Sequence, residues 1–328
     1  MRFCAFVAVA LLIAACAPPI DLTKVAEFSN DTAQASKSFD SLSADYYDSC
    51  ARSAEYRTLN DYAKTLPGPG APPAIEQAPI VSPTFVPLNQ LPAVTPPTPM
   101  PAASPAIAPA SSPEPLPPGP CAKAAAISQA WKASNDIVVG YVEALGAIAG
   151  AQTQTENYGF DKLTGELKGL KPAQQQGIAS LATTIANDFT AAKARGDIAT
   201  FVLQADDSLH YAVATLQNEI DQAYLQQLSF ERGYEADAIR AQLSGGPSAY
   251  RVAAVRSKWA NQLTKLGQRQ QAALAYRSAL QTILTSQEAL KKAAEDKSLS
   301  RQALATIAGD AGSSLLDDVS TIEKAFNR

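Results

Sequence analysis

His210 is the only imidazole in the 328-residue chain and the residue whose type and spacing come closest to a chemical site. Asp207 lies three positions before it, and metal centres in helical bundles present a carboxylate and an imidazole at this spacing. Those centres use two such motifs, whereas this chain has one His. A serine triad would also need His210 as its base, and no Gly-x-Ser-x-Gly segment marks a nucleophile. We therefore interpret the pair as a solvated helix face and expect no metal site.

Other signatures of enzymes and binding modules are missing as well. The sequence has no glycine-rich phosphate loop and no His-Glu-x-x-His motif, so we expect no cofactor and no catalytic residue. Catalysis by carboxylates alone leaves no recognisable pattern, and a hydrolase of this kind remains a minor alternative. With a net charge of −4 the chain is a poor general binder of nucleic acid.

The first sixteen residues form a sorting signal. Met1 and Arg2 precede an apolar run from Phe3 to Ile13, which is followed by Ala14, Ala15 and Cys16. This segment resembles the signal peptide and lipobox of bacterial lipoproteins. The resemblance implies cleavage before Cys16, a thioether-linked diacylglycerol on its sulfur and acylation of the new terminus. An ordinary signal peptide with an incidental Cys is the alternative. No family is recognised beyond this segment.

The residue after the acylated cysteine bears on localisation. Ala17 follows Cys16, and by analogy with enterobacterial lipoprotein sorting a residue other than Asp at this position favours the outer membrane. We expect anchoring there, with the protein body facing the periplasm.

Cys50 and Cys121 remain once Cys4 is removed with the signal and Cys16 is acylated. Two thiols of an exported chain most simply form a disulfide. The bridge would close a loop of about 72 residues and stabilise the fold by roughly 4 kcal/mol through chain entropy. Free buried thiols or an intermolecular bridge are the alternatives. Neither Cys belongs to a Cys-x-x-Cys motif or has a His nearby in sequence, so we interpret the pair as structural.

The chain divides into four regions. Residues 1–15 are the signal, and residues 16–65 hold the anchor Cys and a first helix. Residues 66–120 contain 19 of the 23 prolines and no Lys or Arg, which predicts a disordered loop because Pro fixes φ and lacks an amide donor. Residues 121–328 form a helical bundle.

The predicted fold is all-α, an elongated bundle built around an antiparallel coiled-coil hairpin. Apolar residues recur at helical spacing in segments running to Cys50, from Cys121 to Ala151, from Pro172 to Gly196, from Asp197 to Ser244, from Ser248 past Leu290, and from Leu299 to Phe326. The two longest would form the hairpin. The predicted buried stripe of the first of these two is Ile198, Val202, Ala205, Leu209, Ala212, Leu216, Ile220, Ala223, Gln227, Phe230 and Tyr234.

Two segments carry weak functional signals. Residues 137–151 are mostly apolar, but about 15 residues span only ~22 Å of a ~30 Å hydrocarbon core, so a buried central helix is favoured over membrane insertion. The hairpin tip is rich in cations for an acidic protein, and an exposed basic tip suits an acidic partner. These candidate partner-binding residues are Arg232, Arg240, Arg251, Arg256 and Lys258.

These observations favour a non-enzymatic, lipid-anchored envelope protein that acts as a scaffold or adaptor. Its expected partners are the membrane, through the anchor, and another envelope protein or a second copy of the chain. The alternative is a membrane-acting protein, similar to a helical pore-former, that exposes residues 137–151.

Overall fold

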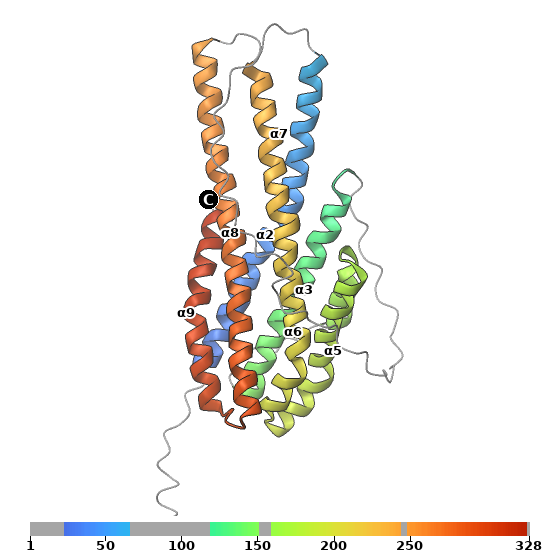
Figure 1. The fold of residues 1–328 in the computed structure, drawn as a ribbon, viewed down its shortest axis with the longest axis vertical. Coiled ribbons are helices and arrows are strands. Elements are labelled where there is room, and N and C mark those ends of the chain that lie inside the picture. The colour runs from blue at the N-terminus through green and yellow to red at the C-terminus, as the bar shows by residue number, and fades with distance from the viewer. Residues whose placement is uncertain (1–22, 66–118, 151–158, 244–247, 327–328) are drawn as a thin grey trace, which may run out of the picture.

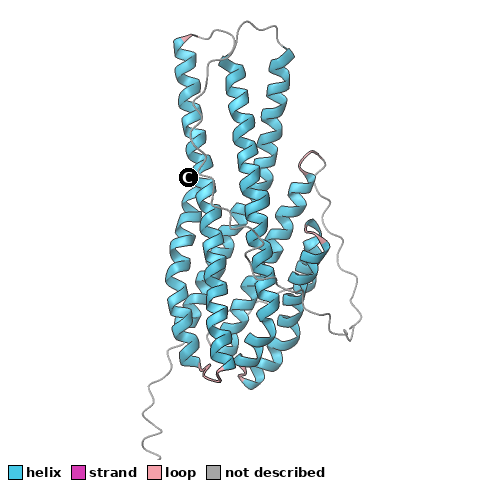
Figure 2. Cartoon of the chain, in the orientation of Figure 1, coloured by secondary structure: helices cyan, strands magenta, loops and turns pink. Residues whose placement is uncertain are grey.

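The protein is an elongated bundle of helices, as predicted (Figure 1). The computed structural model describes residues 23–65, 119–150, 159–243 and 248–326, and over these ranges it contains helices and loops but no strand (Figure 2). Cys16 and residues 66–118 of the proline-rich loop predicted over residues 66–120 lie outside the described residues. The helices are α2 (Thr23–Thr65), α3 (Ala122–Ala149), α4 (Phe160–Glu166), η2 (Leu167–Gly169), α5 (Pro172–Arg195), α6 (Ile198–Glu219), η3 (Ile220–Tyr224), α7 (Leu225–Leu243), α8 (Ala249–Glu295) and α9 (Arg301–Phe326).

The helix ends follow the local signals in the sequence. Asp197 caps α6 by accepting a hydrogen bond from the Thr200 amide at 3.1 Å, which satisfies one free amide of the first turn. Pro172 opens α5, where its missing N–H costs nothing. Gly196 ends α5 in the left-handed region with φ of 65°, a conformation that glycine adopts without a steric penalty.

α3 is the central helix of the bundle. Its residues from Ile137 to Ala149 are buried, apart from the half-buried Glu143. On its N-terminal half, Trp131 packs on Tyr46 of α2 with ring centroids 4.6 Å apart. The expectation of a buried central helix is therefore confirmed for residues 137–149. No described helix is long and apolar enough to cross a membrane.

The predicted hairpin forms, but it is not a two-helix coiled coil. α6, η3 and α7 run one way along the bundle and α8 returns beside them, as the Lys291–Asp206 contact of 2.6 Å shows near their base. Towards the other end, α7 pairs with α2 instead. Gln227 donates to Ser53 at 2.9 Å, and nearer the tip Tyr56 donates to Glu235 at 3.2 Å. Three helices, α2, α7 and α8, therefore reach the tip of the molecule, the end where α7 stops and α8 begins (Figure 1).

The predicted stripe of the α6–α7 helix is wrong beyond Ile220. α6 buries the expected positions through Leu216, but the next buried residues are each one position later than predicted, because Ala223, Gln227, Phe230 and Tyr234 are not buried. The cause is η3, a π-helical turn at Ile220–Tyr224, which accommodates one extra residue and so rotates everything after it. The bundle interior therefore receives Tyr224 from η3 and Leu228, Glu231 and Glu235 from α7.

Candidate functional site

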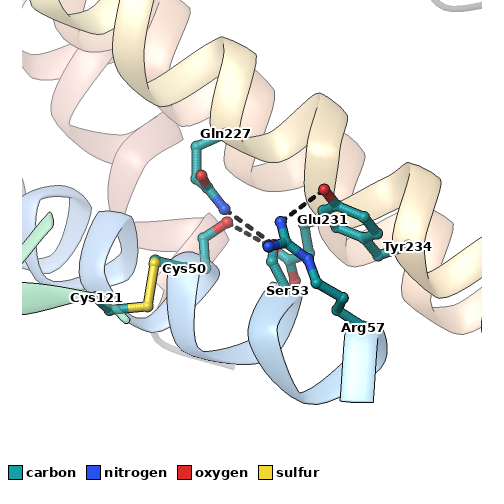
Figure 3. The surroundings of a disulfide bond; sticks show 8 residues. Cys50, Ser53, Arg57, Cys121, Gln227, Glu231 and Tyr234 are labelled. Atoms are coloured by element: carbon teal, nitrogen blue, oxygen red, sulfur yellow. Dashed lines mark hydrogen bonds between the residues drawn. A yellow bond between two sulfur atoms is a disulfide. The ribbon is translucent and has the colours of Figure 1, made fainter. Parts of the chain in front are cut away.

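A disulfide joins α2 to the start of α3. Cys50 and Cys121 are bonded, with their Cα atoms 5.9 Å apart and 71 positions apart in sequence, which agrees with the predicted pairing. Cys121 is buried and Cys50 is half-buried against the core. Figure 3 shows the bridge beside polar contacts between α2 and α7, where Gln227 donates to Ser53 and Arg57 donates to the Tyr234 hydroxyl at 2.7 Å.

Four charged side chains and one tyrosine lie next to the bridge, and all of them except the half-buried Arg52 are buried. We call this group the buried charge network, and it consists of Asp45 and Arg52 from α2, Tyr224 from η3, Glu231 from α7 and Arg269 from α8. Glu231 is 2% exposed. It accepts hydrogen bonds from Arg52 Nε at 2.7 Å and from both terminal nitrogens of Arg269 at 3.0 Å. Ser49 adds a further donor at 2.6 Å.

Asp45 is the second acid of the network. It accepts hydrogen bonds from Arg52 at 2.8 Å, from the Tyr224 hydroxyl at 2.7 Å and from Arg269 at 3.4 Å. Two acids and two guanidinium groups thus balance in charge, and the network joins α2, η3, α7 and α8. Buried charges of this kind are tolerated because each one is paired and hydrogen-bonded.

The pairing determines how these groups titrate. Burial alone would raise the pKa of Glu231, but the hydrogen bonds from Arg52, Arg269 and Ser49 outweigh burial and lower it. Burial alone would lower the pKa of Arg52 and of Arg269, and their hydrogen bonds to Glu231 together with the nearby charge of Asp45 raise both. A carboxylate with a lowered pKa and donors on both oxygens is a poor proton acceptor, so this geometry supports a structural role for Glu231.

Glu235, one turn after Glu231, has the opposite environment. It is 3% exposed and receives one hydrogen bond from a neutral donor, the Tyr56 hydroxyl at 3.2 Å. Burial raises the pKa of Glu235, since neither the Tyr56 hydrogen bond nor the charges of Arg269 and Lys258 offset the loss of water. The two glutamates form a natural comparison, because they are one helical turn apart and their pKa values shift in opposite directions.

The structure places Asp206, not Asp207, beside His210. Asp207 is exposed, and the carboxylate beside the imidazole is Asp206, with 3.5 Å between His210 Nδ1 and Asp206 Oδ1. Glu288 lies on the other side, 3.7 Å from Nε2. Asp206 is itself bound by Lys291 at 2.6 Å and Gln287 at 3.1 Å. Within the described ranges no group of three or more His, Cys, Asp or Glu residues is arranged to hold a metal ion.

The five predicted tip residues fall into two groups. Arg232 and Arg240 of α7 are half-buried, and Arg240 pairs with Asp237 on its own helix. Arg251, Arg256 and Lys258 of α8 are exposed. α8 continues this exposed basic surface to Lys265, a residue outside the predicted set.

The geometry defines the class of molecule: an elongated all-α bundle with a disulfide and a buried charge network near its middle and an exposed basic segment at one end. Comparison of the chain with protein-family models, curated proteins and solved structures gives no match.

Proposed function

We propose that the protein is a non-enzymatic, lipid-anchored envelope protein that holds a partner-binding tip away from the membrane. Cys16, the proposed acylation site, precedes the first residue of α2 by seven positions. Lys24, near the start of α2, lies against Gly309 of α9, and α9 lies in the half of the bundle away from the tip (Figure 1). The 43 residues of α2 then run towards the tip over about 64 Å.

The observation that supports this proposal most directly is the set of connections between helices that lies between these two ends. The buried charge network and the disulfide cross-connect α2 with α3, α7 and α8 in the middle of the molecule. Helices connected in this way suit a spacer or adaptor that holds a partner at a fixed distance from a membrane.

Replacement of Cys16 with Ser tests the anchor. We expect the wild-type chain to incorporate a palmitate analogue and to remain in the membrane fraction after a high-salt wash, because several acyl chains give stable anchoring. The C16S variant should incorporate no label and move to the soluble fraction. The C4S variant is the matched control and should behave as wild type. Retention of unlabelled C16S in washed membranes would contradict the proposal.

The membrane-acting alternative has less support, because the segment that would insert is the centre of the core. Release of residues 137–149 would expose Ile137, Val138 and Tyr141, which are at most 1% exposed. We therefore expect the anchor-free chain to cause no dye leakage from anionic liposomes at pH 7 or pH 5. Leakage at either pH would favour the alternative.

A further inference from the structure

The tip half of α8, which we define as residues 249–265, stands outside the core. None of these residues is buried, whereas burial at helical spacing begins at Leu266. α9 does not cover this segment. Ser278 of α8 hydrogen-bonds Asp318 of α9, so α9, which ends two turns later at Phe326, reaches only about the level of Gln270. Figure 1 shows α8 continuing to the tip beyond that point.

Over most of its length α8 carries only positive charges. From Ala249 to Gln287 the helix has no Asp or Glu, in a chain whose net charge is −4. Two of its cations form salt bridges within the fold, since Arg269 belongs to the buried charge network and Arg277 pairs with Asp221 at 3.4 Å. The remaining four lie on the tip half and are exposed: Arg251, Arg256, Lys258 and Lys265.

Three of these cations form a regular line. Arg251, Lys258 and Lys265 are spaced seven residues apart, so they lie on one side of the helix at intervals of about 10.5 Å. The exposed strip beside them begins with Tyr250, which is 86% exposed, and continues with the short side chains of Ala254, Ser257 and Asn261. From Ala254 onward these short side chains would let another backbone approach closely. In coiled coils, charges that repeat every seven residues beside the contact strip set the choice of partner helix.

We propose that the tip half of α8 is the docking surface for an acidic helix of a partner protein. Carboxylates repeating every seven residues on that helix would match the line of Arg251, Lys258 and Lys265. Pairing of the tip half with the same segment of a second copy would place like charges opposite one another, which disfavours self-association. This inference deepens the proposed function, and rests on it for the idea that the tip meets a partner away from the membrane.

Binding of a designed helix to the purified full-length chain tests the inference. The probe is a fluorescent 28-residue helical peptide with Glu at every seventh position and on its flanks, and the matched peptide has Gln at those positions. We expect the Glu peptide to bind in a salt-sensitive manner and the Gln peptide to bind at least tenfold more weakly. The R251E/K258E/K265E variant should lose at least tenfold in affinity for the Glu peptide and gain affinity for a Lys peptide of the same design.

The K123E/K162E/K168E variant is the control, because it changes the net charge equally at exposed residues away from the tip. Unchanged binding by this variant supports the inference, and an equal loss overturns it. Equally tight binding of extended polyglutamate or of phosphatidylglycerol vesicles would overturn it in favour of a general polyanion surface. Dimerisation of the wild-type chain through this face, abolished in the tip variant, would overturn it in favour of a second copy.

Crosslinking in cells identifies the natural partner. A photoreactive residue at Ala254 or Asn261 should give an adduct whose crosslinked peptide lies in an acidic helix of another protein. Adducts to this chain alone or to lipid alone would overturn the inference. The binding assay is independent of acylation, so its failure leaves the proposed anchor at Cys16 intact, and failure of the C16S experiment leaves the docking surface intact.

Discussion

Replacement of Glu231 with Gln is expected to lower the free energy of unfolding by about 3 kcal/mol, the largest effect that we expect of any single substitution. The change keeps the size of the side chain but removes the charge that balances Arg52 and Arg269. Both guanidinium groups would then share Asp45 as their remaining partner in the network, which leaves a buried positive charge without compensation. Urea unfolding followed by circular dichroism measures the effect.

Replacement of Glu235 with Gln is the matched control. This glutamate is equally buried, but the interior disfavours its charged form and so raises its pKa. Neutralisation should therefore change the free energy of unfolding by less than about 1 kcal/mol, or increase it slightly. Equal destabilisation by both substitutions would show that the network gives Glu231 no special role.

The two variants should also differ in their dependence on pH. The folded pKa of Glu231 is lowered, so its stabilising contribution is complete above its unfolded pKa, about 4.3, and is lost as the pH falls through the folded value. The difference in stability between wild type and E231Q should therefore shrink on acidification. The folded pKa of Glu235 is raised, so its charge costs stability once the pH rises above about 4.3. Any gain in E235Q should appear at neutral pH and vanish in acid.

Removal of the Cys50–Cys121 bridge is expected to cost about 4 kcal/mol. The sulfurs are 71 positions apart in sequence, and a cross-link that closes a loop of this size removes considerable entropy from the unfolded chain. The C50A/C121A variant, unfolded in urea beside the oxidised wild type, measures the loss. Peptide mapping without reductant should find the two cysteines linked, and complete alkylation of both thiols in the native protein would contradict the pairing.

Shortening the loop separates chain entropy from native-state contacts. Deletion of residues 75–110 halves the length of the closed loop. On the entropy model this reduces the contribution of the disulfide by only about 0.6 kcal/mol. A much larger reduction would indicate that residues of the deleted segment stabilise the fold by themselves. An unchanged cost of removing the bridge would indicate that its effect arises mainly from contacts in the native state.

The sequence by itself determined the fold class and most helix ends. Helical spacing of apolar residues gave the all-α bundle, and local signals such as the Asp197 cap, Pro172 and Gly196 act within a few residues of their own positions. Cys50 and Cys121 could be paired by elimination, because the resemblance of the N-terminus to lipoprotein signals assigns the other two cysteines to other roles.

Only the tertiary structure decided which residues α7 buries. The π-helical turn η3 adds one residue to the helix, and a single added residue rotates all later side chains by about 100°. Glu231 therefore points inward where the periodic pattern predicted Phe230, which is 50% exposed. The guanidinium groups that make this burial tolerable come from α2 and α8, through contacts 179 and 38 positions away in sequence. Periodicity describes one helix at a time, so it cannot reveal a charge whose burial depends on partners from other helices.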